Sequence, residues 1–314
     1  MVRVSTLLTG AILLIAPIAI DAQQSQVRPD QIQAFISPVD GSGVPVTDLK
    51  AEEIAMTENG APGKVVSIDP FKLPIKLTLM VDNGNESATA LASIRAGLTG
   101  LVEVLPADIE VTLITIAPQP AMYLRPTADR AQIMRAISRF GVDNDPPRFT
   151  DALVEYAERL EKEFKDKKLT YAPTLVMVST TAQEASTSQR DTVEKALKSL
   201  AARGAKVSLA ITTTKPTNND SVDALKNGRQ ALIARPIITQ SRGKFESMVA
   251  FNQMAMLLPE WGREIALAHT RQINQYRVVI DRPGGATGPL NRPGLKLTRP
   301  GLDGSVSFDG KFSQ

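Results

Sequence analysis

The stretch LTLMVDNGNES, residues 77–87, joins a run of apolar side chains to an abrupt polar end at Asp82. The longer run IKLTLMVD, residues 75–82, has the continuous apolar character of a β-strand that is buried on both faces. Such strands belong to parallel sheets covered by helices, and ligands bind at the loops that follow their carboxyl ends. The stretch therefore predicts an α/β fold, and it directs attention to the loop that begins at Asp82.

The chain downstream alternates between strand and helix patterns. Apolar residues recur at helical spacing from Leu91 to Leu105, which predicts a helix directly after the first strand. Further strands are predicted at 109–117, 174–180, 206–213 and 275–281, and further helices at 129–140, 150–164, 188–204, around 244–258 and at 260–274. This alternation predicts a mostly parallel, Rossmann-like sheet with helices on both faces.

The N-terminus has the pattern of a secretory signal peptide. A basic Arg3 precedes an apolar stretch, and a polar break follows with Ala22 at its end. We therefore expect residues 1–22 to be removed and the protein to be exported, to the periplasm or outside the cell. No later segment is apolar over the length that spans a bilayer, so we expect no integral membrane segment after this removal.

The mature chain divides into three parts by composition. Residues 23–73 contain short strand patterns separated by turn-rich segments, and residues 74–281 form the α/β domain. Residues 282–314 are rich in glycine and proline and again contain short strand patterns. We expect this C-terminal β tail to pack with residues 23–73 as one small β-rich lobe beside the α/β domain.

Composition excludes several classes of function. The 314 residues are 43% apolar, which allows a sizeable core, and the net charge of +3 is too small to indicate binding to nucleic acid. Cysteine is absent, which excludes disulfides, Cys-based zinc sites and iron–sulfur clusters. The single histidine, His269, excludes a His-rich metal centre and is predicted to lie on a helix face or at a helix–sheet contact.

Several motifs in order resemble exported bacterial proteins with a von Willebrand factor type A domain, and more narrowly the VWFA-related proteins common in Acidobacteria. The similar stretches are DGSGVPVTDLKAEEIAMTENGAPGKVVSIDP (40–70), IKLTLMVDNGNES (75–87), FTDAL (149–153), TLVMVSTTAQE (174–184), SRGKF (241–245), INQYRVVID (273–281) and RPGLKLTRPGLDG (292–304). The resemblance covers most of the mature chain. It implies a von Willebrand A domain, which usually carries a metal-ion-dependent adhesion site.

This implied site is degenerate here. The family loop reads Asp-x-Ser-x-Ser, with a Thr from a second loop and an Asp from a third. Asp82 matches the first Asp and Thr150 matches the second-loop Thr, but Gly84 and Glu86 stand at the two Ser positions. Thr180 stands where the third-loop Asp belongs.

Two interpretations of the loop remain open. In one, Asp82, Glu86 and Thr150, helped by Asp151, hold a divalent cation such as Mg²⁺, Mn²⁺ or Ca²⁺, because hard cations prefer oxygen ligands. Glu86 then supplies the negative charge that Thr180 lacks. In the other, the loop holds no metal and forms a polar cap on the strand end.

The resemblance implies an exported, non-enzymatic protein-binding or scaffold module, with no catalytic residues and no cofactor other than this cation. Its partner would be a protein or an extracellular polymer, met at the loops that follow the sheet strands. One alternative is a carboxylate-based hydrolase that uses Asp82 and Glu86, since paired carboxylates can perform acid–base chemistry. Another is a purely structural spacer.

Overall fold

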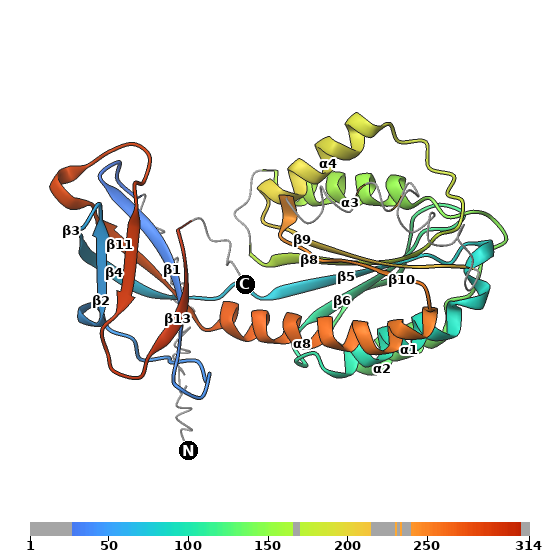
Figure 1. Ribbon diagram of the computed structural model, residues 1–314, viewed down its shortest axis with the longest axis horizontal. Coiled ribbons are helices and arrows are strands. Elements are labelled where there is room, and N and C mark those ends of the chain that lie inside the picture. Colours follow the sequence, from blue (N-terminus) through green and yellow to red (C-terminus); the bar gives the residue numbers. More distant parts are fainter. Residues whose placement is uncertain (1–26, 166–169, 215–229, 231–232, 234–239, 309–314) are drawn as a thin grey trace, which may run out of the picture.

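The computed structural model describes residues 27–165, 170–214, 230, 233 and 240–308, and the chain forms two lobes joined end to end (Figure 1). The predicted signal peptide, residues 1–22, lies outside the described residues. Within the described ranges, no helix combines the length and the apolar character that crossing a bilayer requires.

The larger lobe is built on a six-stranded sheet. In spatial order, its strands are β10 (Phe245–Met248), β9 (Lys206–Thr212), β8 (Ala172–Thr180), β5 (Ile75–Val81), β6 (Glu110–Thr115) and β7 (Ala121–Thr127). The edge strand β7 pairs antiparallel with β6, and the other pairs are parallel. The chain therefore winds outward from β5 in one direction and from β8 in the other, which is the order of a doubly wound sheet.

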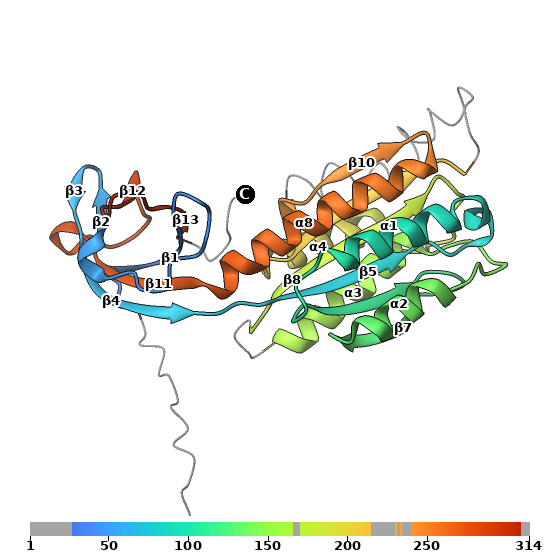
Figure 2. The same cartoon turned by 90° about the horizontal axis from the view of Figure 1, so that it is seen from below.

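Helices cover both faces of this sheet (Figure 1), and Figure 2 looks onto the face that carries α1 and α8. One face carries α1 (Leu91–Glu103), α2 (Arg130–Arg139) and α8 (Met254–Ile273), and the other carries α3 (Phe149–Phe164) and α4 (Arg190–Ala202). Strand β5 serves both cores, because Leu77 and Leu79 pack under α1 and α8 while Met80 packs under α3. The predicted Rossmann-like α/β fold class is confirmed.

The structure differs from the predicted elements in two places. A helix was expected around residues 244–258, but Phe245–Met248 forms the edge strand β10, and a single helix then runs from Met254 through Pro259. A short apolar segment has no clear period, and parallel pairing with β9 decides its conformation. Strand β7 was not predicted, because most of its residues are exposed and it has little apolar signal.

The smaller lobe contains strands from both ends of the chain. Its four-stranded sheet has the order β13 (Asp303–Ser307), β1 (Gln31–Val39), β11 (Gln275–Asp281) and β4 (Lys64–Phe71). A three-stranded sheet has the order β12 (Pro293–Leu297), β2 (Ile54–Glu58) and β3 (Ala61–Pro62). Ile36, Met56 and Val278 lie in the core between them, so the N- and C-terminal segments share one apolar interior.

The predicted end of the α/β domain at residue 281 is wrong, because strand β11 belongs to the smaller lobe. Residues 275–281 were assigned to the α/β domain, but they pair antiparallel with β1 and β4 in the smaller lobe. The reason is that α8 ends at Ile273 and delivers the chain out of the larger lobe. The chain thus crosses between the lobes twice, and the two crossings are joined where the Leu73 N–H donates to the Gln272 carbonyl at 3.1 Å.

A buried ion pair joins the two terminal segments. Arg282 donates from Nε and Nη2 to the two carboxylate oxygens of Glu58, at 2.8 and 2.5 Å. The side chains are only 4% and 6% exposed, respectively. The Asn291 N–H also donates to Glu58 at 3.1 Å, and Arg282 reaches the Gly288 carbonyl at 2.7 Å. All these contacts lower the free energy of the charged pair inside the lobe.

We expect Glu58→Gln to lower the melting temperature of the smaller lobe by roughly 5–10 °C at neutral pH, because it leaves the Arg282 charge buried without its partner. Arg282 also lowers the pKa of Glu58 from 4.5 to about 2. The pair therefore stabilises the fold fully above about pH 4.5 and loses its effect as pH falls towards 2. Thermal unfolding followed across this range checks the prediction.

The exposed Glu52 supplies the matched control, and Glu52→Gln should leave the melting temperature unchanged. A Glu58→Gln variant as stable as the wild type at neutral pH would contradict the assigned role of the pair.

Candidate functional site

The loop after Asp82 lies at the switch point of the sheet, where the winding direction reverses between β5 and β8. Asp82 follows the last residue of β5, and Thr180 is the last residue of β8, so the two side chains meet at adjacent strand ends. Open α/β sheets bind ligands at this place. The short 3-10 helix η2 (Asn85–Thr89) then leads into α1.

The carboxylate of Asp82 is fully buried, and the protein itself supplies its hydrogen-bond donors. Thr180 donates to Oδ2 from its hydroxyl at 2.7 Å and from its backbone N–H at 3.1 Å. The Gly84 N–H donates to Oδ1 at 2.9 Å, and the Ser179 hydroxyl lies 3.4 Å from Oδ2. Thr180, which replaces the family aspartate, therefore acts as a donor to Asp82 instead of as a second acidic ligand.

Burial and hydrogen bonding act on Asp82 in opposite directions. Loss of water around the buried carboxylate raises the pKa of Asp82, and the donors from Thr180 and Gly84 partly offset that rise. The charged form thus depends on these donors, since a buried carboxylate without them is costly.

Gly84 stands where the family has its first serine, and the structure has no room for a side chain there. A Cβ atom at this position would lie 2.5 Å from Cδ and 2.9 Å from the backbone nitrogen of Pro147. Ser87, one position beyond the family's second serine, is buried, and its hydroxyl donates to the Gly84 carbonyl at 2.7 Å. Its hydroxyl thus stabilises the turn of the loop itself.

Glu86 and Thr150 do not join Asp82 in a common set of contacts. Glu86 is exposed on η2, whereas Asp82 is fully buried. Thr150 lies in the first turn of α3, and its hydroxyl donates to Glu184 Oε1 at 3.3 Å while its N–H donates to Oε2 at 3.1 Å. The two oxygens of Asp151 accept hydrogen bonds from Thr187 and Ser188.

Two functional residues were missed from the sequence. Glu184 accepts from Thr150 and from the Ser186 hydroxyl, and so it fixes the N-terminal end of α3 to the loop after β8. Asn83 accepts from the Ile116 and Ala117 N–H groups at 3.1 and 2.9 Å, which ties the β5 loop to the end of β6. Their short-range sequence context has no signal for these long-range bonds, although both lie within the quoted family stretches.

The residues at the switch point do not fit the oxygen set of a divalent cation. Such a cation needs several oxygens directed at one point. Here Gly84 offers none from its side chain, and Thr180 directs its hydroxyl proton at Asp82. Over the parts of the chain that the structure describes, no cluster of three or more Asp, Glu or His residues is arranged to hold a metal ion. The hydrogen bonds of Asp82 are those that the polar-cap interpretation predicts, and the binding of a cation stays a prediction.

His269 is buried at the contact between α8 and the sheet. Its Nδ1 accepts the Ile75 N–H at 3.1 Å, so this nitrogen carries no proton, and Nε2 is the donor to Asp108 Oδ2 at 2.9 Å. Both ring nitrogens are thus occupied in holding α8 against the start of β5. This arrangement gives His269 a structural role and leaves no ring nitrogen for acid–base chemistry.

No family model matches this sequence, and no curated protein matches it. Among solved structures, a von Willebrand factor type A protein from Catenulispora acidiphila has a TM-score of 0.48 and 8% identity, covering 90% of this chain and 73% of that one. The conserved hypothetical protein BatB from Bacteroides thetaiotaomicron has a TM-score of 0.44 and 13% identity, covering 61% and 98%. An aerotolerance-related membrane protein from Bacteroides fragilis has a TM-score of 0.43 and 13% identity, covering 60% and 99%.

The strand order and the helix layers of the larger lobe are those of a Rossmann-like, doubly wound sheet, and a second lobe contributes additional strands.

Proposed function

We propose that this chain is an exported, non-enzymatic binding or scaffold module that docks a protein or an extracellular polymer on its loop face. The loop face is defined as residues 83–89, 141–148 and 181–188, at the carboxyl ends of the strands. The observation that carries the proposal is that these loops are hydrogen-bonded to one another into a preformed surface, with the one acidic group at the switch point sealed beneath it.

Backbone hydrogen bonds join the loop 141–148 to each of the other two loops. The Asp143 N–H donates to the Asn83 carbonyl at 2.7 Å, and the Asn85 N–H donates to the Asp145 carbonyl at 3.1 Å. The Ala185 N–H donates to the Pro147 carbonyl at 2.8 Å. A surface fixed in this way loses little conformational entropy on binding, which favours recognition of a partner.

The outer side of the loop face determines the partner's chemistry. Glu86 and Asp145 are exposed there, and Val142, an apolar residue, is 36% exposed beside them. A metal-dependent adhesion site captures an acidic group through its cation, whereas this face presents carboxylates of its own. It therefore fits a neutral or basic partner surface better than an acidic one.

The hydrolase alternative has no comparable support. Asp82 is fully buried with both oxygens engaged, and Glu86 is exposed outside it. Acid–base catalysis requires groups within hydrogen-bond reach of a substrate, and Asp82 has no exposed surface to offer one.

Site-specific photocrosslinking tests the proposal. A photoreactive residue at the exposed position Asn85 should form a discrete adduct in an extract of the source organism, and Glu86→Lys with Asp145→Lys should abolish it. The same photoreactive residue at the exposed Glu103, at the far end of α1, is the matched control and should form no such adduct.

Identical adducts from positions 85 and 103 would contradict a specific loop-face partner. Turnover of an ester, phosphate or glycoside substrate that Glu86→Gln abolishes would favour the hydrolase alternative instead.

A further inference from the structure

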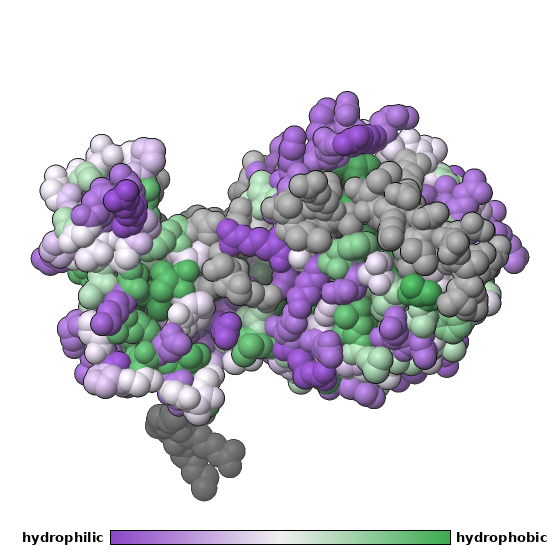
Figure 3. Space-filling view, in the orientation of Figure 1, coloured by the Kyte–Doolittle hydropathy of each residue, from purple (hydrophilic) through white to green (hydrophobic). Residues whose placement is uncertain are grey.

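A concave region lies between the lobes, at the end of the sheet opposite the loop face. It is a pocket of about 880 Å³ at the amino ends of β5, β8 and β9, closed on one side by β1 and α8. This volume lies within the range of sites that enclose small ligands. In Figure 3, apolar side chains gather on the smaller lobe beside the junction, and hydrophilic ones gather on the larger lobe's side of it.

One wall of the pocket is apolar. Phe35 and Phe71 pack against each other with ring centroids 5.0 Å apart, and Leu73 lies beside them in the lining. Leu267 on α8 also lines the pocket and is 49% exposed, which is unusual for leucine in a well-packed helix face. This surface would gain free energy by being covered with an apolar chain.

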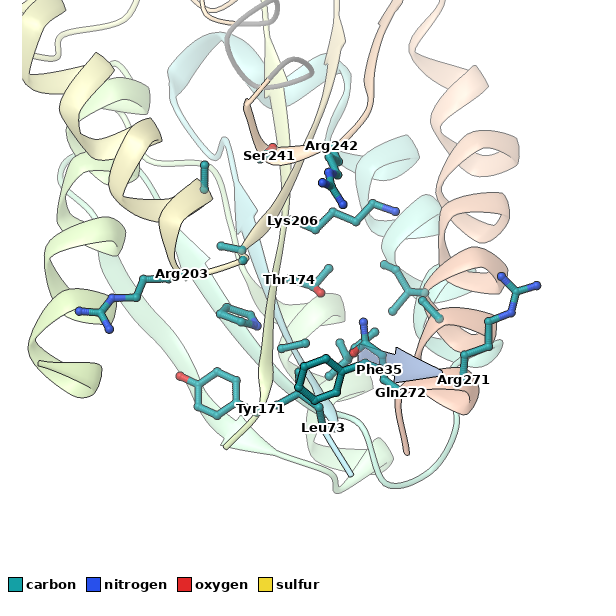
Figure 4. A pocket seen from close by; sticks show the side chains of 18 of the residues that line it. Phe35, Leu73, Tyr171, Thr174, Arg203, Lys206, Ser241, Arg242, Arg271 and Gln272 are labelled. Carbon is teal, nitrogen blue, oxygen red and sulfur yellow. The ribbon is translucent and has the colours of Figure 1, made fainter. Parts of the chain in front are cut away.

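The opposite wall is basic. Among the described residues, five basic side chains line the pocket against one acidic side chain: Arg203, Lys206, Arg242, Lys244 and Arg271 against Glu264. Glu264 is already paired with Lys244, and Arg203 points away from the centre to bind Glu161 (Figure 4). The Lys206 side chain extends across the pocket toward α8, the Arg242 guanidinium lies above it, and Phe35 and Leu73 lie on the other side (Figure 4). The positive charge of this wall favours the binding of an anion.

The surroundings of Lys206 act on its charge. Burial lowers the pKa of Lys206 below its usual range, and the positive charge of Lys244 adds to this effect, while Glu264 opposes it. An anionic group in the pocket would reverse that shift by stabilising the ammonium form.

Arg242 is held at the rim by an unusual backbone conformation. Its φ of 55° lies in the left-handed region, where a side chain other than Gly, Asn or Asp is uncommon. The next residue, Gly243, packs so closely on the Val207 carbonyl that the turn has little freedom to relax. Strained conformations of this kind gather at ligand sites, and here the strain directs a guanidinium toward the pocket.

Three buried polar atoms of the lining have no hydrogen-bond partner among the residues that the structure describes. They are Gln240 Oε1, Gln272 Oε1 and Ser305 Oγ. Unsatisfied buried polar atoms are rare in native proteins and call for a bound molecule or water. The Ser305 hydroxyl can donate to a ligand oxygen.

We propose that this pocket binds an amphipathic anion, a molecule with one apolar chain and a carboxylate or phosphate head. The head lies against Lys206 and Arg242, and the chain covers Phe35, Leu73 and Leu267. This inference is independent of the proposed function at the loop face, because the two regions lie at opposite ends of the sheet.

Titration calorimetry on the full mature chain tests it, with probes kept below their micelle-forming concentrations. Decanoate and decyl phosphate should bind, and comparing the two identifies the preferred head. Decyltrimethylammonium, which has the opposite charge, and acetate, which lacks the chain, should not bind. Decanol should bind more weakly than decanoate.

Variants separate the two walls. Lys206→Met and Arg242→Asn should each weaken decanoate binding about tenfold or more and leave decanol binding unchanged. Asparagine tolerates the left-handed backbone at position 242, so the fold should persist. Leu267→Ala should weaken decanoate and decanol binding by the same factor.

Met256 gives the matched control, because it lies on the same helix, is 68% exposed and is not part of the pocket. Met256→Ala should change neither affinity. Equal binding of decanoate and decyltrimethylammonium, or no binding of either anion by a folded chain, would overturn the proposal.

Discussion

Replacing Thr180 by aspartate should destabilise the protein by about 3–5 kcal/mol at neutral pH. The substitution introduces the acidic residue that the von Willebrand A family, which the sequence resembles, has at this position. It also places a second carboxylate where the Thr180 hydroxyl now donates to Asp82 at 2.7 Å, so it exchanges a donor for a like charge in a fully buried place. Denaturant unfolding measures the loss.

The pH dependence of Thr180→Asp identifies the cause of its lower stability. Two adjacent buried carboxylates raise the pKa of the pair above the ordinary value for aspartate, so the folded state takes up a proton that the unfolded state releases. The stability of Thr180→Asp should therefore recover as pH falls from neutral towards about pH 5. Thr180→Val is the control: it loses the hydroxyl without adding charge and should cost about 1–3 kcal/mol, with a smaller recovery at acid pH than Thr180→Asp shows.

Divalent cations give a further readout of the same variant. Because Gly84 and Glu86 still do not supply inward oxygens, we expect millimolar Mg²⁺ or Mn²⁺ to leave the melting temperatures of the wild type and of Thr180→Asp unchanged. A Thr180→Asp variant as stable as Thr180→Val at neutral pH would show that Asp82 is not the buried, charged acceptor assigned here.

Replacing Gly243 by alanine should destabilise the larger lobe by about 3 kcal/mol. A Cβ atom at this position would lie 1.6 Å from the carbonyl oxygen of Val207 and 2.4 Å from its carbon, and both are backbone atoms of β9. The turn must therefore move away from β9. That movement breaks the bonds at the entrance to β10, where the Lys244 carbonyl accepts the Leu209 N–H at 2.8 Å.

Hydrogen exchange shows where in the fold Gly243→Ala loses stability. The amide protons that pair β10 with β9 should exchange faster in Gly243→Ala, while those that pair β5 with β6 remain protected. Gly141→Ala is the matched control, since a Cβ atom there meets no atom within 4 Å, and it should change stability by no more than about 0.5 kcal/mol. Equal stability of the two variants would contradict the close approach of the turn to Val207.

The fold class could be predicted from the sequence because its determining signals are local. A strand buried on both faces has to be mostly apolar, and five of the seven residues of β5 are apolar. Strand β7 and the short β10 could not be predicted, because they lie at the edges of the sheet, where exposed residues carry little apolar pattern. Their conformations are decided by pairing with a neighbour.

The sequence predicts where the candidate site lies, but it does not predict which residues contact one another there. Asp82 and Thr180 do meet at the switch point, as parallel strand ends require. The donor role of Thr180 was not foreseen, because a threonine in place of an aspartate looks like a missing ligand in sequence. Glu184 and Asn83 act through bonds to residues more than thirty positions away, and no local pattern reports such bonds.

The pocket between the lobes had no sequence signal at all. Its lining comes from both ends of the chain, from α8 and from three strand starts, so no single stretch of sequence carries its pattern. Lys206 and Arg242 look like ordinary surface charges in sequence. Only the path of the chain through both lobes brings them above Phe35.

That path has a consequence for the order in which the protein matures. Strand β1 pairs with β11 in the register that joins Gln31 to Asp281, and its other edge waits for β13. When the chain is synthesised from its N-terminus, both edges of β1 thus stay unpaired until almost all of the remaining sequence has been made. Contacts of such long sequence separation form slowly, and exposed strand edges invite pairing with other chains. The smaller lobe is therefore the last part to assemble, and newly made molecules need protection at β1 until it does.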